Sequence, residues 1–254
     1  MPSRRTLLKT LAGLPLAAIL SDPRLARAAA EATRLVQIKT AAGRDAAAAL
    51  ALPDATPASS VLLIHEWWGL NDQIKSMALE FARQGYVALA VDLFGGRVAA
   101  NPDEARELIG KVNPDEATDT LRSWVEWLNN SNESNRRVAM VGWCFGGGWA
   151  LRGSLAAPVD ATVVYYGRVD LPADRLRALK GPVLGHFASQ DKSITPEMVR
   201  GFERAMAEAG KPLTLHWYDA GHAFANPTGD NYDREDANLA WRRTLDFLGR
   251  ELKV

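Results

Sequence analysis

The only cysteine of the chain lies at the centre of a glycine-flanked turn. Cys144 occupies the middle of the run GWCFG at residues 142–146, after the apolar run VAMV and before a helical pattern of small residues. A strand that turns sharply into a helix needs such glycines, because larger side chains would collide with the neighbouring backbone. This nucleophile elbow makes Cys144 a candidate nucleophile. On these five residues alone, a small buried cysteine remains an alternative interpretation.

Candidate partners follow Cys144 in the order that hydrolases with this elbow use, which is nucleophile, acid and then histidine. Asp191 follows the apolar run PVLGHFA, and His222 follows the alternating run LTLHWY. Each therefore lies just past the carboxyl end of a predicted strand, at the same sheet edge as the elbow. An imidazole would raise the thiolate fraction of a cysteine, and a carboxylate would orient that imidazole. Asp170 and Asp219 compete with Asp191 for the role of the acid.

A second acidic group follows the apolar run VLLI at residues 61–64. The next segment, HEWWGLN, begins with His65 and Glu66. A zinc-protease helix would need a second histidine at the position of Gly69, so we predict no metal site. Glu66, beside two tryptophans, is expected to be a partly desolvated carboxylate near the thiol. The side chains expected to line an aromatic pocket are Trp67, Trp68, Trp143 and Phe224.

Apolar runs alternate with helical patterns through the chain, and these elements must position the candidate residues. Strands are expected at residues 35–40, 46–52, 61–65, 86–92, 138–142, 161–166, 183–188 and 213–218. Helices are expected at residues 74–84, 115–128, 146–155, 196–209 and 233–252, and a short one within 95–114 as part of a lid. This alternation predicts an α/β fold, with a mostly parallel central sheet and helices on both faces. One domain is expected over residues 31–254.

Several of these segments together resemble the dienelactone hydrolase family. They are the HEWWGLN segment, the cysteine elbow, the run YYG at residues 165–167, Asp191 and the run GHAF that contains His222. The likeness extends from about residue 60 to the C-terminus. It implies an α/β-hydrolase fold and a Cys144–His222–Asp191 triad. It also implies a carboxymethylenebutenolidase-like hydrolase of ester or lactone bonds that forms an acyl-enzyme and uses no cofactor.

The same resemblance implies roles for other residues. Glu66 would hold the resting thiol and help to deprotonate it, and the backbone N–H groups of Phe145 and Trp67 would form an oxyanion hole. The family grips the carboxylate of its substrate with two arginines, and Arg97 matches the first of them. The second should follow the catalytic histidine by four residues, where this chain has Asn226. This departure weighs against dienelactone itself as the substrate.

The N-terminus has the pattern of an export signal. Arg4 and Arg5 form a twin-arginine pair, residues 11–20 are apolar but too short to span a bilayer, and residues 26–28 read ARA, as at a cleavage site. We therefore predict a twin-arginine signal peptide over residues 1–30, recognised by the Tat export machinery. The mature protein is then expected in the periplasm or outside the cell.

Composition narrows the range of partners. The chain carries 30 Lys and Arg against 30 Asp and Glu, and its basic residues form no run that would indicate a nucleic-acid partner. We expect a monomer that acts on a small-molecule ester or lactone without a metal. Two alternatives stay open. The chain could be a non-catalytic binding protein on a hydrolase scaffold, or a thiol-dependent transfer protein that relies on an external thiol.

Overall fold

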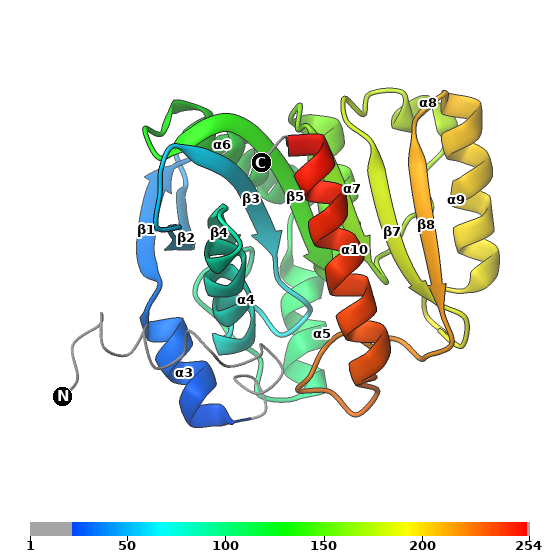
Figure 1. The fold of residues 1–254 in the computed structure, drawn as a ribbon, viewed down its shortest axis with the longest axis horizontal. Coiled ribbons are helices and arrows are strands. Elements are labelled where there is room, and N and C mark those ends of the chain that lie inside the picture. The colour runs from blue at the N-terminus through cyan, green and yellow to red at the C-terminus, as the bar shows by residue number, and fades with distance from the viewer. Residues whose placement is uncertain (1–21, 253–254) are drawn as a thin grey trace.

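A computed structural model describes residues 22–252, which are built around one eight-stranded sheet (Figure 1). The strands are β1 (Arg34–Lys39), β2 (Asp45–Ala51), β3 (Ala58–Ile64), β4 (Val87–Val91), β5 (Ser134–Trp143), β6 (Ala161–Tyr165), β7 (Val183–Ala188) and β8 (Leu213–Tyr218). Their order in the sheet is β1-β2-β4-β3-β5-β6-β7-β8. Strand β2 is antiparallel to both neighbours, and every later pair is parallel. The predicted α/β fold with a mostly parallel sheet is confirmed.

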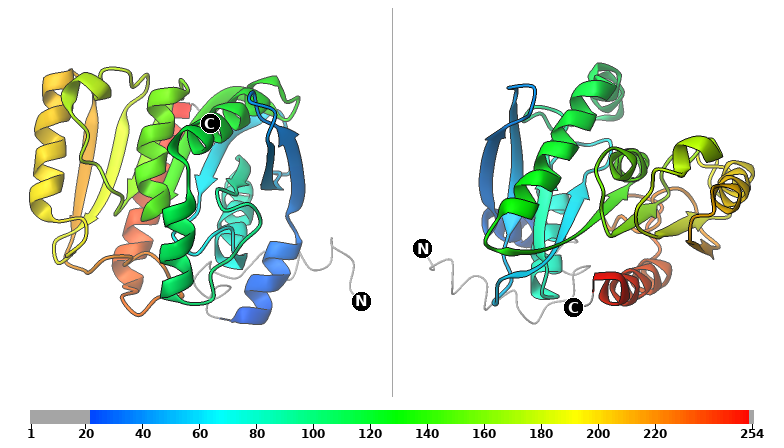
Figure 2. Two further views of the ribbon diagram at one scale, coloured as in Figure 1. Left: turned by 180° about the vertical axis from the view of Figure 1, so that it is seen from behind. Right: turned by 90° about the horizontal axis from the view of Figure 1, so that it is seen from above.

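Helices cover both faces of this sheet (Figures 1 and 2). One face carries α4 (Asp72–Arg83) and α10 (Arg234–Leu252), and the other carries α6 (Pro114–Asn130), α7 (Phe145–Ala156) and α9 (Pro196–Ala209). The remaining helices are α3 (Pro23–Glu31), α5 (Pro102–Lys111) and the short α8 (Ala173–Leu176). Polar side chains cap several helix starts; Asn71 accepts from the Ile74 N–H at the start of α4, and Asn101 accepts from the Glu104 N–H at the start of α5.

The position of strand β3 in the sheet explains why its residues are continuously apolar and do not alternate with polar ones. Val61 and Leu63 pack into the core under α4 and α10, whereas Leu62 and Ile64 pack into the core under α6. Successive side chains point to opposite faces of a strand, and here both faces are covered. All four residues are 0 % exposed. The continuous apolar run therefore marks the middle of the sheet.

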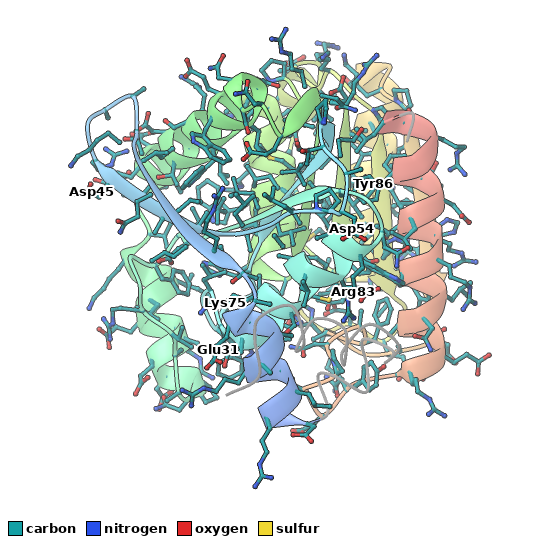
Figure 3. All side chains as sticks on the ribbon, turned by 60° about the vertical axis from the view of Figure 1, so that its left-hand side comes forward. Glu31, Asp45, Asp54, Lys75, Arg83 and Tyr86 are labelled. Carbon is teal, nitrogen blue, oxygen red and sulfur yellow. The ribbon has the colours of Figure 1, made fainter. Side chains whose placement is uncertain are left out.

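The N-terminal helix α3 was not predicted, because it falls within the expected signal peptide. Its fully buried Ala29 packs against Leu79 of α4, and Ser76 of α4 donates a hydrogen bond to the Ala26 carbonyl. Figure 3 views this side of the molecule, with Glu31 labelled on α3 and Lys75 on α4. The expected cleavage site at residues 26–28 thus lies inside a helix that packs on the domain. The twin-arginine pair lies outside the described residues, and no helix within residues 22–252 is long and apolar enough to cross a bilayer.

The parallel strands bring distant parts of the sequence to one sheet edge. Ile64 at the end of β3 pairs with Gly142, one residue before the end of β5, and the last residues of β5 and β6 pair with each other. The segments that follow these strands therefore leave the sheet side by side. Strands β7 and β8 continue the same arrangement. Loops after the carboxyl ends of parallel strands are where ligands bind in open α/β sheets.

Candidate active site

Cys144 is held at a strained turn between β5 and α7. Its backbone has φ 52° and ψ −116°, a left-handed conformation that is unfavourable for a residue with a side chain. A Cβ on Gly142 would lie 2.0 Å from the Gly146 carbonyl oxygen, and one on Gly146 would lie 2.1 Å from the Ile64 carbonyl oxygen. Both glycines are therefore required by close backbone contacts, as the sequence pattern predicted.

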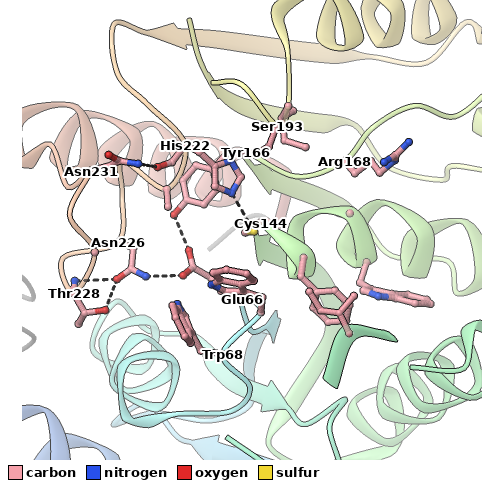
Figure 4. A pocket seen from close by; sticks show the side chains of 18 of the residues that line it. Glu66, Trp68, Cys144, Tyr166, Arg168, Ser193, His222, Asn226, Thr228 and Asn231 are labelled. Carbon is pink, nitrogen blue, oxygen red and sulfur yellow. Dashed lines mark hydrogen bonds between the residues drawn. The ribbon is translucent and has the colours of Figure 1, made fainter. Parts of the chain in front are cut away.

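The thiol of Cys144 begins a hydrogen-bonded chain of three side chains, of which Figure 4 shows the contact between Cys144 and His222. His222 Nε2 lies 3.1 Å from Cys144 Sγ, and His222 Nδ1 lies 2.6 Å from Asp191 Oδ2. The other carboxylate oxygen of Asp191 accepts hydrogen bonds from the Ser193 and Ile194 N–H groups, at 2.8 and 2.9 Å. The backbone thus fixes the carboxylate, the carboxylate fixes the imidazole, and the imidazole reaches the sulfur.

Electrostatics favour charge on both partners of this His–Asp pair. Burial would lower the pKa of His222, but its hydrogen bonds to Asp191 and Cys144 and its attraction to both raise that pKa to about 10. Burial would likewise raise the pKa of Asp191, yet hydrogen bonds from His222, Ile194 and Ser193 lower it below the usual value. The site therefore stabilises an imidazolium beside a carboxylate at neutral pH.

The two competing carboxylates are engaged elsewhere. Asp170 forms an ion pair with Arg168, with 2.5 Å between Oδ2 and Nη2. Asp219 is exposed and accepts hydrogen bonds from Ser189 and Gln190. Asp191 is thus the acid that the fold places against His222.

Glu66 lies in a separate buried cluster beside the thiol (Figure 4). Its two oxygens accept hydrogen bonds from the Tyr166 hydroxyl at 3.1 Å and from Asn226 Nδ2 at 2.5 Å. The Asn226 Oδ1 accepts from Thr228 through both its N–H and its hydroxyl, which fixes the orientation of the amide. Burial raises the pKa of Glu66, and the hydrogen bonds and the attraction to His222 offset only part of this rise. Within residues 22–252 Cys144 Sγ is hydrogen-bonded to His222, and both Glu66 oxygens are directed to other partners.

A buried histidine fixes the turn that follows β3. The Nδ1–H of His65 donates to the Glu66 carbonyl at 2.6 Å, and its Nε2 accepts from the Leu93 N–H at 3.2 Å. Burial lowers the pKa of His65, so the ring is neutral. Because Gly146 touches the carbonyls of Ile64 and His65, this turn lies against the start of α7. The two N–H groups expected as oxyanion donors, those of Trp67 and Phe145, therefore belong to segments that lie next to each other.

A cavity of about 790 Å³ opens above Cys144 and His222. Trp67 and Trp68 line it, as the sequence predicted, and Phe145 and Trp149 of α7 add two more aromatic walls. The sequence analysis missed Trp149, although its helical spacing from the elbow places it on the same face of α7 as Phe145. A volume of this size suits a small organic molecule.

Three residues expected around the substrate do not line this cavity. Trp143 ends β5 on the opposite face of the sheet and stacks on Tyr165, with ring centroids 5.4 Å apart. Phe224 is 0 % exposed and stacks on Tyr218 in the core. The side chain of Arg97 is half-exposed and pairs with Glu107 at 3.7 Å. Successive residues of a strand point to opposite faces of the sheet, so the side chain of Trp143 can point away from the cavity although Cys144 is the next residue. The expectation that Trp143 lines the cavity is therefore wrong.

The comparisons with known proteins agree with this fold. A cysteine at a strand-to-helix elbow, with an acid and a histidine on later loops of a mostly parallel sheet, defines an α/β hydrolase. The sequence model of the dienelactone hydrolase family matches residues 46–252, and the chain belongs to that family.

Individual relatives are similar over nearly their whole length. A carboxymethylenebutenolidase of Pseudomonas putida is 28 % identical over 227 residues, which cover 85 % of this chain and 96 % of the relative. Carboxymethylenebutenolidase 1 of Cupriavidus pinatubonensis is 26 % identical over 223 residues, 84 % of this chain and 95 % of that protein. A dienelactone hydrolase-like promiscuous phosphotriesterase from metagenomic libraries has the same fold, with a TM-score of 0.78, 19 % identity and coverage of 86 % and 98 %.

Proposed function

We propose that this protein hydrolyses carboxylic esters or lactones, with Cys144 as the nucleophile and a thioester acyl-enzyme as the intermediate. The observation that carries the proposal is the aligned chain of three side chains, with 3.1 Å from Sγ to Nε2 and 2.6 Å from Nδ1 to Oδ2. Membership of the dienelactone hydrolase family supports the choice of bond, because its carboxymethylenebutenolidase relatives are hydrolases.

In the first half-reaction, the Cys144 thiolate attacks the carbonyl carbon and forms a C–S bond. The carbonyl electron pair moves to oxygen, where the N–H groups of Phe145 and Trp67 would donate hydrogen bonds. Removing one such donor typically costs about 10²–10³-fold in kcat. The tetrahedral adduct then collapses, the C–O bond breaks, and the leaving alkoxide takes the proton from His222 Nε2.

In the second half-reaction, neutral His222 acts as a base. It takes a proton from water as the water oxygen attacks the thioester carbonyl, and the C–S bond then breaks to return the thiolate and release the acid. Asp191 stabilises the imidazolium that forms again in this step. Although burial opposes it, hydrogen bonds and attraction to Asp191 and Cys144 raise the pKa of His222 to about 10, so His222 is a strong enough base to take the proton of the thiol.

We assign Glu66 a positioning role within this mechanism. Its carboxyl is anchored by Tyr166 and Asn226, and its carbonyl is anchored by His65. The next residue is Trp67, whose amide is the proposed second oxyanion donor. Fixing Glu66 at both ends therefore fixes the direction of that amide, which is what a preorganised oxyanion hole requires.

The decisive experiment replaces the sulfur. Cys144→Ala should abolish hydrolysis of p-nitrophenyl butyrate and the acyl adduct seen by mass spectrometry after acid quench, while the free energy of unfolding changes by at most about 1 kcal/mol. Turnover by Cys144→Ala would place the nucleophile elsewhere. A wild type that binds esters without turnover or adduct would be a binding protein, and one that turns over only with an added thiol would be a transfer protein.

Export through the twin-arginine route is part of the same proposal. It is supported by the Arg4–Arg5 pair, the short apolar stretch and the small residues that follow. Fractionation of cells that express the full chain should place the wild type outside the cytoplasm, and Arg4→Lys with Arg5→Lys should retain it. The mass of the exported protein tests where it is cut, because cleavage after residue 28 would remove much of α3. An unshifted distribution in the double variant would refute this route.

A further inference from the structure

One face of α7 forms a wall of the cavity for about two helical turns. Phe145, Gly148, Trp149 and Arg152 all line the cavity, and their spacing places them on one side of a helix. At about 1.5 Å per residue, Arg152 lies about 12 Å further along the helix than Cys144. The cavity is therefore elongated and has a reactive end and a distant end.

The part between these ends is apolar. The rings of Phe145 and Trp149 meet edge to face, with centroids 6.3 Å apart, and form a continuous aromatic surface along this wall. Ile109 of α5 and the indole of Trp68 line the same cavity. An extended hydrocarbon chain or an aromatic group fits this middle section better than a polar one.

The distant end carries a cation without an ion-pair partner. The guanidinium carbon of Arg152 lies 5.9 Å from the centroid of the Trp149 ring, and the residue is exposed. Among the described residues Arg152 forms no ion pair, whereas the neighbouring cavity residue Arg168, labelled in Figure 4, is neutralised by Asp170. Asp170 also attracts Arg152, but it is paired with Arg168, so the guanidinium on the indole has no carboxylate within ion-pair distance among the described residues. It is therefore placed to bind an anionic group.

The reactive end has the opposite character. Asn226 stands there, uncharged and committed to Glu66, and Arg97 does not line the cavity. Of the other positively charged groups that line the cavity, His222 is committed to Asp191 and Arg168 to Asp170. A carboxylate next to the scissile carbonyl would thus find no free cation, whereas one at the far end of a long substrate would meet Arg152.

We propose that Arg152 is an anion-binding subsite and that the substrates are elongated, mainly apolar esters that end in a carboxylate far from the reacting carbonyl. This proposal rests on the proposed ester hydrolysis and names the substrate class of that same site. Arg152 is a specificity-determining residue in this scheme, since it touches the substrate but takes no part in bond making.

The test compares matched p-nitrophenyl esters, with spontaneous hydrolysis subtracted. The long pair is mono-p-nitrophenyl suberate against p-nitrophenyl octanoate, and the short pair is mono-p-nitrophenyl succinate against p-nitrophenyl butyrate. For the wild type, kcat/KM should favour the carboxylate by about tenfold in the long pair, the scale of one charge-assisted hydrogen bond, and not in the short pair. The preference should shrink as salt rises, because the contact is at an exposed rim.

The second part of the test uses variants of Arg152 to show whether this residue causes the preference for the carboxylate ester. Arg152→Ala should bring the long-pair ratio close to one, and Arg152→Glu should reverse it in favour of an ester that ends in an ammonium group. Arg122→Ala is the matched control, because Arg122 is an exposed mid-helix residue of α6 that is not among the residues lining this cavity. Its ratio should equal that of the wild type.

The outcomes separate the two proposals. If the wild type hydrolyses octanoate but shows no preference for suberate, or if Arg152→Glu keeps the wild-type ratio, the subsite is refuted and ester hydrolysis stands. If no ester of either pair is hydrolysed, the proposed function fails, and the substrate class fails with it. Circular dichroism of each variant checks that the exposed substitution leaves the fold intact.

Discussion

Two buried carboxyl groups lie beside the same imidazole, and their environments drive them in opposite directions. Asp191 and Glu66 are each 3 % exposed and each accept hydrogen bonds at both oxygens. Yet the pKa of Asp191 is lowered and that of Glu66 is raised. Burial is the largest influence in both cases, and it favours the neutral form.

The difference lies in the donors. Asp191 accepts from the imidazolium of His222 and from two backbone N–H groups at 2.8 and 2.9 Å, which together outweigh burial. Glu66 accepts from a phenol and an amide, both neutral, and these do not outweigh it. The donors around Asp191 thus favour its charged form, whereas the surroundings of Glu66 shift its carboxyl towards the neutral form.

Asp191→Asn tests the ionic side of this comparison and should have the largest effect. The amide can no longer stabilise the imidazolium or hold its tautomer, so kcat for an activated ester should fall by about 10³–10⁴-fold. The control is Asp219→Asn, an exposed carboxylate three positions before His222 in the chain that should keep the wild-type kcat. A loss of less than about tenfold in Asp191→Asn would show that the orienting acid lies elsewhere.

The pH profile of kcat/KM measures the same pair. His222 carries the proton for the leaving group below its pKa of about 10 and loses it above, so the wild-type rate should fall above about pH 10. In Asp191→Asn the imidazolium is less stabilised, and this basic limb should move down by more than about one pH unit. A wild-type limb at or below about pH 8 would contradict the raised pKa.

The same shift predicts how stability depends on pH. A histidine whose pKa is raised on folding stabilises the folded state fully below its unfolded value of about 6.5, and that contribution is lost as pH rises towards the folded value. Asp191 behaves in the opposite sense, because its lowered pKa stabilises the fold above about 3.8 and the gain is lost on acidification. Urea denaturation of the wild type and of Asp191→Asn across pH separates the two contributions.

The sequence alone allowed prediction of the sheet and of the residues around Asp191, the first of the two carboxyl groups compared. All eight strands follow apolar or alternating runs. Cys144 stands directly after β5, and Asp191 and His222 follow the ends of β7 and β8 by three and four residues. Local pattern determines such features, since a buried strand and its end are visible within about ten residues. The helix α3 escaped prediction because an alanine-rich stretch after an apolar one also has the composition of a cleavage region.

The hydrogen-bond partners of Glu66 could not be predicted from the sequence, because they come from distant parts of the chain. Asn226 reaches Glu66 across 160 positions of sequence, and Tyr166 reaches it across 100. The departure at Asn226 was visible as a missing arginine, but its role as the partner of Glu66 was not. The position of Arg152 on the cavity wall could have been predicted, because it follows Phe145 by two helical turns and so lies on the same face of the helix that begins at the elbow.

Asn226→Leu tests the buried cluster around Glu66 by removing one of the two hydrogen-bond donors of its carboxyl group. Glu66 keeps only the Tyr166 hydroxyl, and a buried polar group without its partner costs about 1–3 kcal/mol in the free energy of unfolding. The loss should grow as pH rises, because ionised Glu66 then lacks a donor that its charge requires. Urea denaturation measures it, with Asn238→Leu on the exposed side of α10 as the control, expected within about 0.5 kcal/mol. Equal stability of the two variants would contradict the anchoring role.

Glu66→Gln should have the smallest effect, and it decides what this carboxyl does. The amide keeps the size and shape of a neutral carboxyl, its oxygen can still accept from Asn226 Nδ2, and its NH₂ can donate to the Tyr166 hydroxyl. We therefore expect kcat to fall by less than about fivefold, the basic limb of the pH profile to stay within about half a pH unit, and iodoacetamide to alkylate Cys144 at the wild-type rate. Glu66→Ala removes the hydrogen bonds to Tyr166 and Asn226 and keeps only the contact of the backbone carbonyl with His65, so it should lose more activity than Glu66→Gln. A loss beyond about 100-fold in Glu66→Gln would instead make Glu66 the base that activates the thiol, because only a role that needs its negative charge separates the two side chains.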